Sequence, residues 1–331
     1  MKEAILRALR EADGYLSGQE LAGKLSVSRT AVWKNIRQLQ AEGYKIEAVS
    51  NRGYRLVESP DNVTEEELTS LLDTEWIGAQ VYCYDQVTST NQVAKALAEE
   101  GAADGALVVA NEQTAGKGRY GRHWGTPAGK TIAMTLILRP KLPPEQISMV
   151  TLVAGMAVAQ ACREICHVDA CIKWPNDVVV NGKKICGILT EMTTDIHSVS
   201  YIVVGIGINT RVSDFPPELC DKAASLHREM ERLGYDASFR RSELIAAVMK
   251  CFEMLYTQFL KTGDLSSLKD CYEQLLVNRD AVVRVLSPGN EYTGRAEGIN
   301  DRGELLVRRE DGTLEKVYAG EVSVRGVLGY V

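Results

Sequence analysis

The spacing of hydrophobic residues changes twice along this chain of 331 residues. Up to residue 43, hydrophobic residues recur at helical intervals, and a central region then alternates between strand-like and helix-like segments. From about Asn278 the pattern becomes short alternating strands separated by turns. A period near 3.6 predicts helices and a period of two predicts strands. We therefore expect an α+β protein of three domains, at residues 1–62, 63–276 and 277–331.

The first domain is predicted to contain three helices followed by a hairpin. The pattern predicts a helix at 2–10, a second helix that starts at the capping-box sequence Ser17-Gly-Gln-Glu20, and a third at 29–43. Two short strands about the turn Asn51-Arg-Gly53 follow. This order of elements is typical of a winged helix-turn-helix, which places its recognition helix in the DNA major groove.

The third helix has one hydrophobic stripe and one polar face. Val32, Ile36 and Leu39 are expected to be buried, which leaves the opposite face and the wing for DNA. Residues 1–57 carry a net charge of +4, against −10 for the remainder. The alternative is a three-helix docking domain with a solvated basic face. The predicted DNA-binding residues are Ser28, Arg29, Thr30, Trp33, Lys34, Arg37, Arg52 and Arg55.

The segment Asn111–Trp124 combines three glycines with several cationic side chains. Glycine lets a backbone approach a ligand closely, and Lys and Arg bind carboxylate and phosphate oxygens. A P-loop is excluded, because Asn111 replaces its first glycine and Gly118 replaces its Ser or Thr. The glycine spacing matches a dinucleotide loop, but no helical pattern follows. A lid over a small anion, a solvated turn and a nucleic-acid arm remain as alternatives.

The central domain is predicted to be mixed α/β with adjacent hairpins, and the last domain a small β-barrel. Helices are expected at 90–100, 146–166, 218–232 and 242–261. Strands are expected at 79–84, 107–110, 131–138, 172–180, 184–192 and 199–208, with a hairpin turn at Asn181-Gly182.

Further polar motifs occur at the ends of these elements. Val87-Thr-Ser-Thr-Asn91 lies between a strand and a helix, where Ser89 or Thr90 is alternatively a plain N-cap. Lys173-Trp-Pro-Asn-Asp177 groups a cation, an amide and a carboxylate about a bend. Lys184 follows, and Gly205-Ile-Gly-Ile-Asn209 ends a strand. Each motif alone is weak evidence for a site, but their order and spacing together are specific.

With these motifs the chain closely resembles the bifunctional biotin–protein ligase and biotin-operon repressor family over nearly its whole length. The resemblance implies a winged helix, a biotin/lipoate-ligase-like catalytic domain and an SH3-like barrel. It also implies a two-step reaction. Biotin and ATP form biotinyl-5′-adenylate and pyrophosphate, and a lysine of the biotin carboxyl carrier protein then displaces AMP to give an amide.

The resemblance also implies roles for individual residues. The residues expected to act on the reacting groups are Lys117, Arg119, Lys184 and Asp177, and Asp177 is also the candidate ligand for Mg²⁺. The expected biotin-binding residues are Ser89, Thr90, Asn91, Gln113, Lys117, Gly118, Arg119 and Lys184. The expected ATP-binding residues are Arg122, Trp124, Lys173, Asn176 and Asn209. Lys117 departs from the arginine that is common at this position in the family, so it keeps the charge but not the bidentate fork.

The family implies that biotinyl-adenylate favours a homodimer that binds operator DNA. We expect a cytoplasmic location, because the eight cysteines include no C-x-x-C pair. We expect no membrane span, because the hydrophobic stretches look shorter than the ~20 residues required. Three alternatives stay open: a lipoate ligase, a biotin-sensing transcription factor without catalysis, and a ligase whose winged helix no longer binds DNA.

Overall fold

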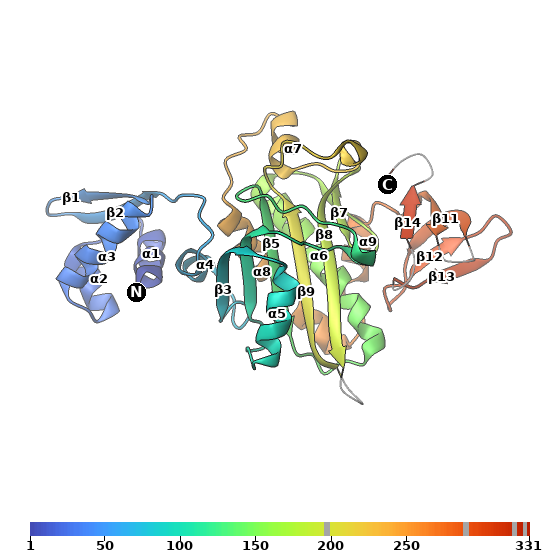
Figure 1. The fold of residues 1–331 in the computed structure, drawn as a ribbon, viewed down its shortest axis with the longest axis horizontal. Coiled ribbons are helices and arrows are strands. Elements are labelled where there is room, and N and C mark those ends of the chain that lie inside the picture. The colour runs from blue at the N-terminus through green and yellow to red at the C-terminus, as the bar shows by residue number, and fades with distance from the viewer. Residues whose placement is uncertain (195–198, 287–290, 320–322, 327–329) are drawn as a thin grey trace.

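The three parts of the chain follow one another along the long axis of the molecule (Figure 1). This computed structural model describes residues 1–194, 199–286, 291–319, 323–326 and 330–331. A small helical domain at the N-terminus is followed by a central sheet with its helices. A second, smaller sheet lies at the other end, near the C-terminus.

The N-terminal domain has the predicted winged helix-turn-helix order. Its helices are α1 (Lys2–Glu11), α2 (Gly18–Leu25) and α3 (Arg29–Ala41), and its hairpin is β1 (Lys45–Val49) with β2 (Gly53–Glu58). The capping box is present, because Ser17 accepts from the Glu20 amide and Glu20 accepts from the Ser17 amide. The predicted stripe of Val32, Ile36 and Leu39 is buried in a core of its own.

The central domain is built on a mixed sheet of seven strands. Its order is β3-β4-β5-β9-β8-β7-β6, in which β3 and β4 are parallel and the other neighbours are antiparallel. The strands are β3 (Val81–Val87), β4 (Leu107–Gln113), β5 (Thr131–Leu138), β6 (Ala170–Lys173), β7 (Asp177–Val180), β8 (Lys183–Thr194) and β9 (Val199–Asn209). The predicted hairpin at Asn181-Gly182 joins β7 to β8, and both residues adopt positive φ there.

Helices cover both faces of this sheet. Helix α5 (Thr90–Glu99) packs on one face with small side chains such as Ala94 and Ala98. Helices α6 (Ile147–Cys166) and α8 (Arg241–Thr262) pack together in the main core on the other face. The expectation about hydrophobic stretches needs correction, because residues 144–166 are long and apolar enough to span a membrane. However, 72% of the most apolar window is buried, as expected for a core helix.

The helix predicted at 218–232 is shorter in the structure. It begins at Leu226 as α7 (Leu226–Arg232), after a single 3-10 turn (Pro217–Leu219). Backbone hydrogen bonds link Lys184 to Lys222 and Ala224 about an isolated parallel bridge to Ala223, so these residues bind β8 instead of continuing a helix. The short helices α4 (Glu65–Leu71) and α9 (Lys269–Leu275) were not predicted.

The C-terminal domain, predicted as a small β-barrel, is a small antiparallel sheet. Its order over the described residues is β13-β12-β11-β10-β14. The strands are β10 (Val282–Leu286), β11 (Tyr292–Ile299), β12 (Leu305–Arg308), β13 (Leu314–Val317) and β14 (Ser323–Gly326). Trp174 fixes this domain to the central one: its indole N–H donates to the Gly303 carbonyl over 2.9 Å, and its amide donates to Asn278 over 2.8 Å.

A buried carboxylate on α4 joins the winged helix to the central domain. Glu67 is fully buried and binds Arg10 at 2.7 Å and the Tyr44 hydroxyl at 2.6 Å, both from the N-terminal domain. From the central domain, Arg240 binds the same carboxylate at 3.0 Å. Nearby, Asp61 accepts hydrogen bonds from Arg241. These pairs fix α4 between the two domains.

Candidate active site

The polar motif at the start of α5 is connected to the end of β4. The Gln113 side-chain carbonyl accepts from both the amide (2.8 Å) and the hydroxyl (3.0 Å) of Thr90. The Gln113 amide group donates to Thr126 over 2.9 Å. Ser89 is the N-cap residue, but its side chain makes no capping hydrogen bond. The plain N-cap interpretation therefore does not account for Ser89.

Asn91 is held in one orientation beneath the sheet. Its carbonyl accepts from the buried Thr135 hydroxyl over 2.8 Å, and its amide donates to Glu191 over 2.7 Å. A methyl group at Gly205 would lie 2.2 Å from the Asn91 oxygen, so that strand position must be glycine. Burial opposes ionisation of Glu191, but hydrogen bonds from Lys95 and Asn91 hold its pKa below the ordinary value. A donor and acceptor network thus lies fixed beside α5.

The Gly-rich segment forms an irregular hairpin over residues 113–126. Gln113 pairs with Thr126 and Lys117 with His123 as isolated antiparallel bridges. The tip is a 3-10 turn (Arg119–Gly121) in which Tyr120 adopts φ 58°. A methyl group at Gly116 would lie 2.5 Å from the Trp124 carbonyl, so glycine allows the two sides to meet. We call residues 113–126 the flap.

Two glycines of the sheet make room for Trp124 at the end of the flap. A methyl group at Gly207 would lie 2.4 Å from the Trp124 indole nitrogen, and one at Gly187 would lie 3.2 Å from its ring. The Lys184 ammonium lies 5.3 Å from the Trp124 ring centroid. Trp124 therefore lies flat against the sheet beside a cation that is also a candidate for phosphate binding.

Three charged residues from two motifs meet at the start of β7. The Lys184 ammonium lies 2.5 Å from Asp177 Oδ1, and the Lys173 ammonium lies 4.0 Å from Asp177 Oδ2. Tyr330 completes the group by donating its hydroxyl to Asp177 Oδ2. Burial disfavours the ionised form of Asp177. The two ammonium groups and the hydrogen bonds from Lys184 and Tyr330 nevertheless hold its pKa below 3.8.

Arg119 connects the tip of the flap to the rest of the central domain and to the C-terminal domain. Its guanidinium donates to the Asn176 side chain over 3.1 Å and to the Ala319 carbonyl over 2.7 Å. Asn176 in turn donates to the Ile188 carbonyl in β8. The flap is thus fixed by contacts to the central sheet and to the C-terminal domain.

The residues around Asp177 do not fit a resident Mg²⁺ ion. Both of its oxygens are already held, one by Lys184 and one by Tyr330, and Lys173 adds a second positive charge. Among the described residues, no group of three His, Cys, Asp or Glu side chains is arranged to hold a metal. These charges oppose a resident ion at Asp177, and a role for Asp177 as a magnesium ligand stays a prediction.

The structure brings most of the predicted site residues into two groups, and within each group the residues contact one another. One consists of Thr90, Asn91 and Gln113, with the flap residues 116–118 beyond Gln113. The other consists of Trp124, Lys173, Asp177 and Lys184. Asn209 donates to the Ala224 carbonyl, and Lys117 and Arg122 are exposed. Thr135, Glu191 and Tyr330 were missed, because no local motif marks them.

The predicted DNA-binding residues of helix α3 share one exposed face. Arg29, Thr30, Trp33, Lys34 and Arg37 of α3 are all exposed, while Ser28 caps that helix. Trp33 is 53% exposed, and the Arg37 guanidinium lies 5.7 Å from its ring. The wing residues Arg52 and Arg55 stack on Tyr15, and Arg55 also pairs with Glu47 at 2.9 Å.

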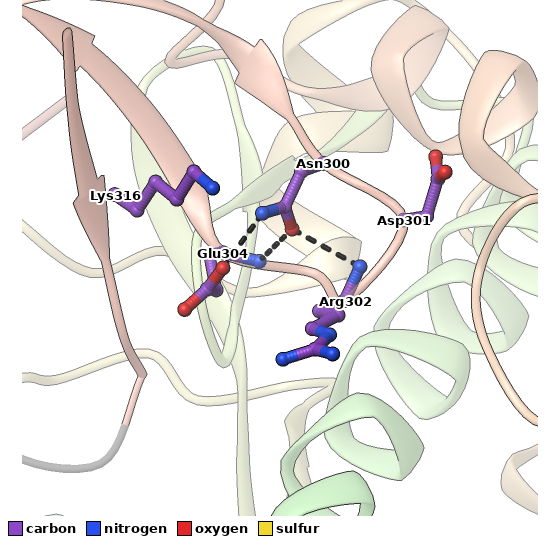
Figure 2. A pocket seen from close by; sticks show the side chains of 5 residues that line it. All are labelled: Asn300, Asp301, Arg302, Glu304 and Lys316. Atoms are coloured by element: carbon purple, nitrogen blue, oxygen red, sulfur yellow. Dashed lines mark hydrogen bonds between the residues drawn. The ribbon is translucent and has the colours of Figure 1, made fainter.

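A hollow in the C-terminal domain is separate from these groups (Figure 2). It has a volume of about 410 Å³ and is lined by polar residues of the β11–β12 turn together with Lys316. The Asn300 side chain uses its hydrogen bonds on the turn itself, binding the amides of Arg302 and Glu304 and the Glu304 carboxylate. Its polar lining thus stabilises the turn.

Comparisons with known proteins agree with this geometry. Residues 83–209 match the biotin/lipoate A/B protein ligase family, residues 2–55 an HTH domain, and residues 282–325 the biotin protein ligase C-terminal domain. The chain is 38% identical to the bifunctional ligase/repressor BirA of Bacillus subtilis over 94% of both chains. It is 28% identical to BirA of Escherichia coli over 97% of this chain and 96% of that protein.

A solved structure shows the same architecture beyond the winged helix. Biotin protein ligase from Aquifex aeolicus, in complex with biotin and ATP, superimposes with a TM-score of 0.65 at 29% identity. The match covers 75% of this chain and 99% of that one. The cationic residues and the flap thus lie within a fold that is known with both ligands bound.

Proposed function

The chain belongs to the biotin protein ligase family of the bifunctional ligase/repressor type, and we propose that it both biotinylates a carrier protein and represses transcription. As a carbon–nitrogen ligase it activates biotin with ATP and releases pyrophosphate and AMP. The single observation that carries the proposal is the group of Lys173, Asp177, Lys184 and Trp124 beside the flap, together with the network in which Thr90 binds Gln113 and Thr135 binds Asn91.

In the first step, a biotin carboxylate oxygen attacks the α-phosphorus of ATP, and the bond to pyrophosphate breaks. Both reactants are anions, so fixed positive charge is required to bring them together and to stabilise the transition state. Lys184 and Lys173 supply that charge from the sheet, and Arg119 and Lys117 supply it from the flap. The Trp124 ring, lying on Gly207, is the surface for adenine.

The donors and acceptors beside α5 suit the polar head of biotin. Thr90, Asn91 and Gln113 are already oriented by their hydrogen bonds, which lowers the ordering cost of binding. Ser89 adds a hydroxyl that does not cap the helix. Arg122 and Asn209 remain candidates for the nucleotide.

In the second step, the amine of a carrier-protein lysine attacks the acyl carbon of the adenylate. The carbon–nitrogen bond forms, the carbon–oxygen bond to phosphate breaks, and AMP leaves with the electron pair while the amine proton passes to solvent. The adenylate is already activated, so no protein nucleophile is required. The acceptor is the biotin carboxyl carrier protein of acetyl-CoA carboxylase.

Magnesium enters this scheme as part of the ATP complex. Mg²⁺ commonly binds proteins through one or two carboxylates together with substrate phosphates, and it keeps several waters. A resident site at Asp177 does not fit its two ammonium neighbours. We therefore assign Mg²⁺ to the triphosphate of the incoming nucleotide.

The winged helix makes the ligase a regulator of transcription. The exposed face of α3 and the wing arginines are the surface for operator DNA, and biotinyl-adenylate favours a homodimer that binds it. A ligand promotes dimerisation only when it binds the dimer-competent state more tightly. The adenylate would order the flap, and this ordering would account for its tighter binding to the dimer-competent state. The eight cysteines are all free, which fits a reducing cytoplasm.

Exchange of labelled pyrophosphate into ATP tests the first step. We expect exchange that depends on biotin. Lipoate should not support it, because a biotin ligase activates the carboxylate of biotin and not that of lipoate. Exchange without biotin, or with lipoate alone, would contradict the assignment. Absence of any exchange, combined with biotin binding, would favour a sensor without catalysis.

A gel-shift titration tests the repressor role. DNA from upstream of biotin synthesis or transport genes should be retarded when biotinyl-adenylate is present, and the R37A variant should lose that shift. Sedimentation of the protein with and without adenylate reports the homodimer. DNA retardation that does not respond to the adenylate would contradict ligand-dependent repression.

A further inference from the structure

Tyr330 comes from the chain end and reaches the charged centre of the site. Its hydroxyl donates to Asp177 Oδ2, and the Lys173 ammonium lies 3.8 Å from the centroid of its ring. A cation at that distance over an aromatic face is attracted by the ring quadrupole. One tyrosine therefore contacts both charged residues of the Lys173–Asp177 motif.

Val331, the residue after Tyr330, lies beside the β7–β8 hairpin. A methyl group at Gly326 would lie 1.9 Å from the Val331 carbonyl oxygen, so only glycine at that point lets the end fold back. A methyl group at Gly182, in the turn after β7, would lie 3.9 Å from the Val331 side chain. The chain end thus lies beside the strand that carries Asp177.

Tyr330 and Lys184 each bind a different oxygen of the Asp177 carboxylate. Lys184 lies at Oδ1 and the Tyr330 hydroxyl at Oδ2, and the Asp177 side chain is only 12% exposed. Partners on both oxygens fix the plane of a carboxylate, and through it the position of the ammonium that it holds. Without the hydroxyl, Oδ2 would keep only the more distant Lys173.

We propose that Tyr330 is a positioning residue for the two lysines that face the phosphates of ATP. It orients Lys184 through Asp177 and Lys173 through its ring. The inference rests on the proposed ligase function and adds to it a C-terminal residue outside the described motifs. It predicts that Tyr330 acts more on use of ATP than on biotin binding, because Thr90, Asn91 and Gln113, which suit the head of biotin, belong to a separate network.

Two substitutions separate the two contacts. Y330F removes the hydrogen bond to Asp177 but keeps the ring over Lys173, whereas Y330L removes both. Loss of a hydrogen bond to a charged group is expected to lower kcat of biotin-dependent exchange roughly tenfold in Y330F. Y330L should lower kcat further and raise the KM for ATP several-fold. The KM for biotin should change less than the KM for ATP in either variant, because Tyr330 reaches the expected biotin-binding residues only through Lys184.

Tyr292, in strand β11 of the C-terminal sheet, offers a matched control. Its ring also lies under a cation, Arg309, at 3.9 Å. Y292F and Y292L make the same chemical changes and should leave kcat and both KM values unchanged. G326A moves the chain end without altering Tyr330 itself, and it should reproduce the kinetics of Y330L while Y292L does not.

Several results would overturn the inference. Exchange by Y330F and Y330L equal to that of the wild type would show that Tyr330 positions nothing. Faster exchange, or faster transfer to the carrier protein, would show that the chain end obstructs the site instead. A rise in the KM for biotin alone would assign Tyr330 to biotin binding, together with Thr90, Asn91 and Gln113. Wild-type protein without biotin-dependent exchange would contradict the proposed function itself, and so the two failures are distinguishable.

Discussion

Single glycines of the sheet determine where the Trp124 side chain lies, which we expect to stack on adenine. G207A would place a methyl group 2.4 Å from the indole nitrogen of Trp124 and push the ring off the sheet. We expect the Kd for ATP to rise roughly three- to tenfold, in line with the loss of one aromatic contact. Calorimetric titration with ATP measures this, and Trp124 fluorescence should shift as the ring becomes more exposed.

Gly125 provides the comparison for that substitution. It follows Trp124 in the flap, its φ is not positive, and an added methyl group would meet only the His123 side chain, at 3.9 Å. G125A should therefore bind ATP like the wild type. Equal ATP affinity in G207A and the wild type would show that Trp124 does not contact the nucleotide.

Asp177 gives the protein a specific acid sensitivity. Lys184, Lys173 and the Tyr330 hydroxyl hold its pKa below the ordinary value in the folded state, so the ionised carboxylate stabilises the fold at higher pH. That stabilisation is lost as the pH falls through the lowered pKa. The difference in unfolding free energy between the wild type and D177N should be constant from about pH 7 to about pH 4 and shrink below that.

Urea unfolding at a series of pH values tests this dependence. A difference that stays constant down to the lowest pH, or one that begins to shrink near neutrality, would contradict the lowered pKa of Asp177. D169N is the control, because Asp169 is an exposed carboxylate on the same edge of the sheet with a single arginine partner. The unfolding free energy of D169N should differ little from that of the wild type at every pH in the series.

At the scale of elements, the flap is expected to retain the adenylate and to report its presence. R119A removes hydrogen bonds to Asn176 and to the Ala319 carbonyl. Dissociation of biotinyl-adenylate should become roughly ten- to a hundredfold faster, as for the loss of charged hydrogen bonds. K117A should act in the same direction. H123A, on the same hairpin, should retain the adenylate normally.

Ligand-induced dimerisation should weaken in parallel with adenylate retention. Sedimentation velocity at saturating adenylate separates the two effects. If R119A and K117A dimerise like the wild type while losing the adenylate quickly, the flap does not couple occupancy to assembly.

Most elements of the fold could be predicted from local sequence patterns. The capping box at Ser17, the hairpin turn at Asn181-Gly182 and the mostly hydrophobic strand β5 each carry their own signal within a few residues. The helix at 218–232 was overextended, because the backbone of Lys184 pairs with residues 222–224 and draws them out of a helix. Such a long-range pairing leaves no local pattern.

The candidate site was predictable where its residues stand in motifs. Thr90, Gln113 and Lys184 come from these motifs, and the structure shows which neighbours orient them, while their contact with a ligand stays a prediction. Tyr330 was missed because its contact with Asp177 joins residues 153 positions apart. Trp174 stands within the site motif but is buried and binds the C-terminal domain.

At the scale of the whole molecule, Glu67 joins the DNA-binding domain to the ligase. Its buried carboxylate holds Arg10 from one side and Arg240 from the other. E67A would leave two partly buried guanidinium groups facing each other, and we expect a loss of about 2–4 kcal/mol of stability. Urea unfolding measures the loss, and the winged helix should unfold separately from the core.

E65Q is the control for this prediction. Glu65 lies on the same helix but is exposed, so its substitution should change stability by less than about 0.5 kcal/mol. E67A should also weaken adenylate-dependent DNA retardation, because the two winged helices of a dimer would no longer be held at a fixed spacing. Normal DNA binding by a destabilised E67A would show that the orientation of the winged helix is set elsewhere.

The mass of the carrier protein tests the central claim most directly. The biotinyl domain of the carboxyl carrier protein is incubated with this protein, ATP, Mg²⁺ and either biotin or lipoate, and its intact mass is then measured. We predict the addition of one biotinyl group at a single lysine with biotin, and no change with lipoate or without ATP. An unchanged mass with biotin, or a lipoyl adduct, would contradict the assignment of this chain as a biotin ligase.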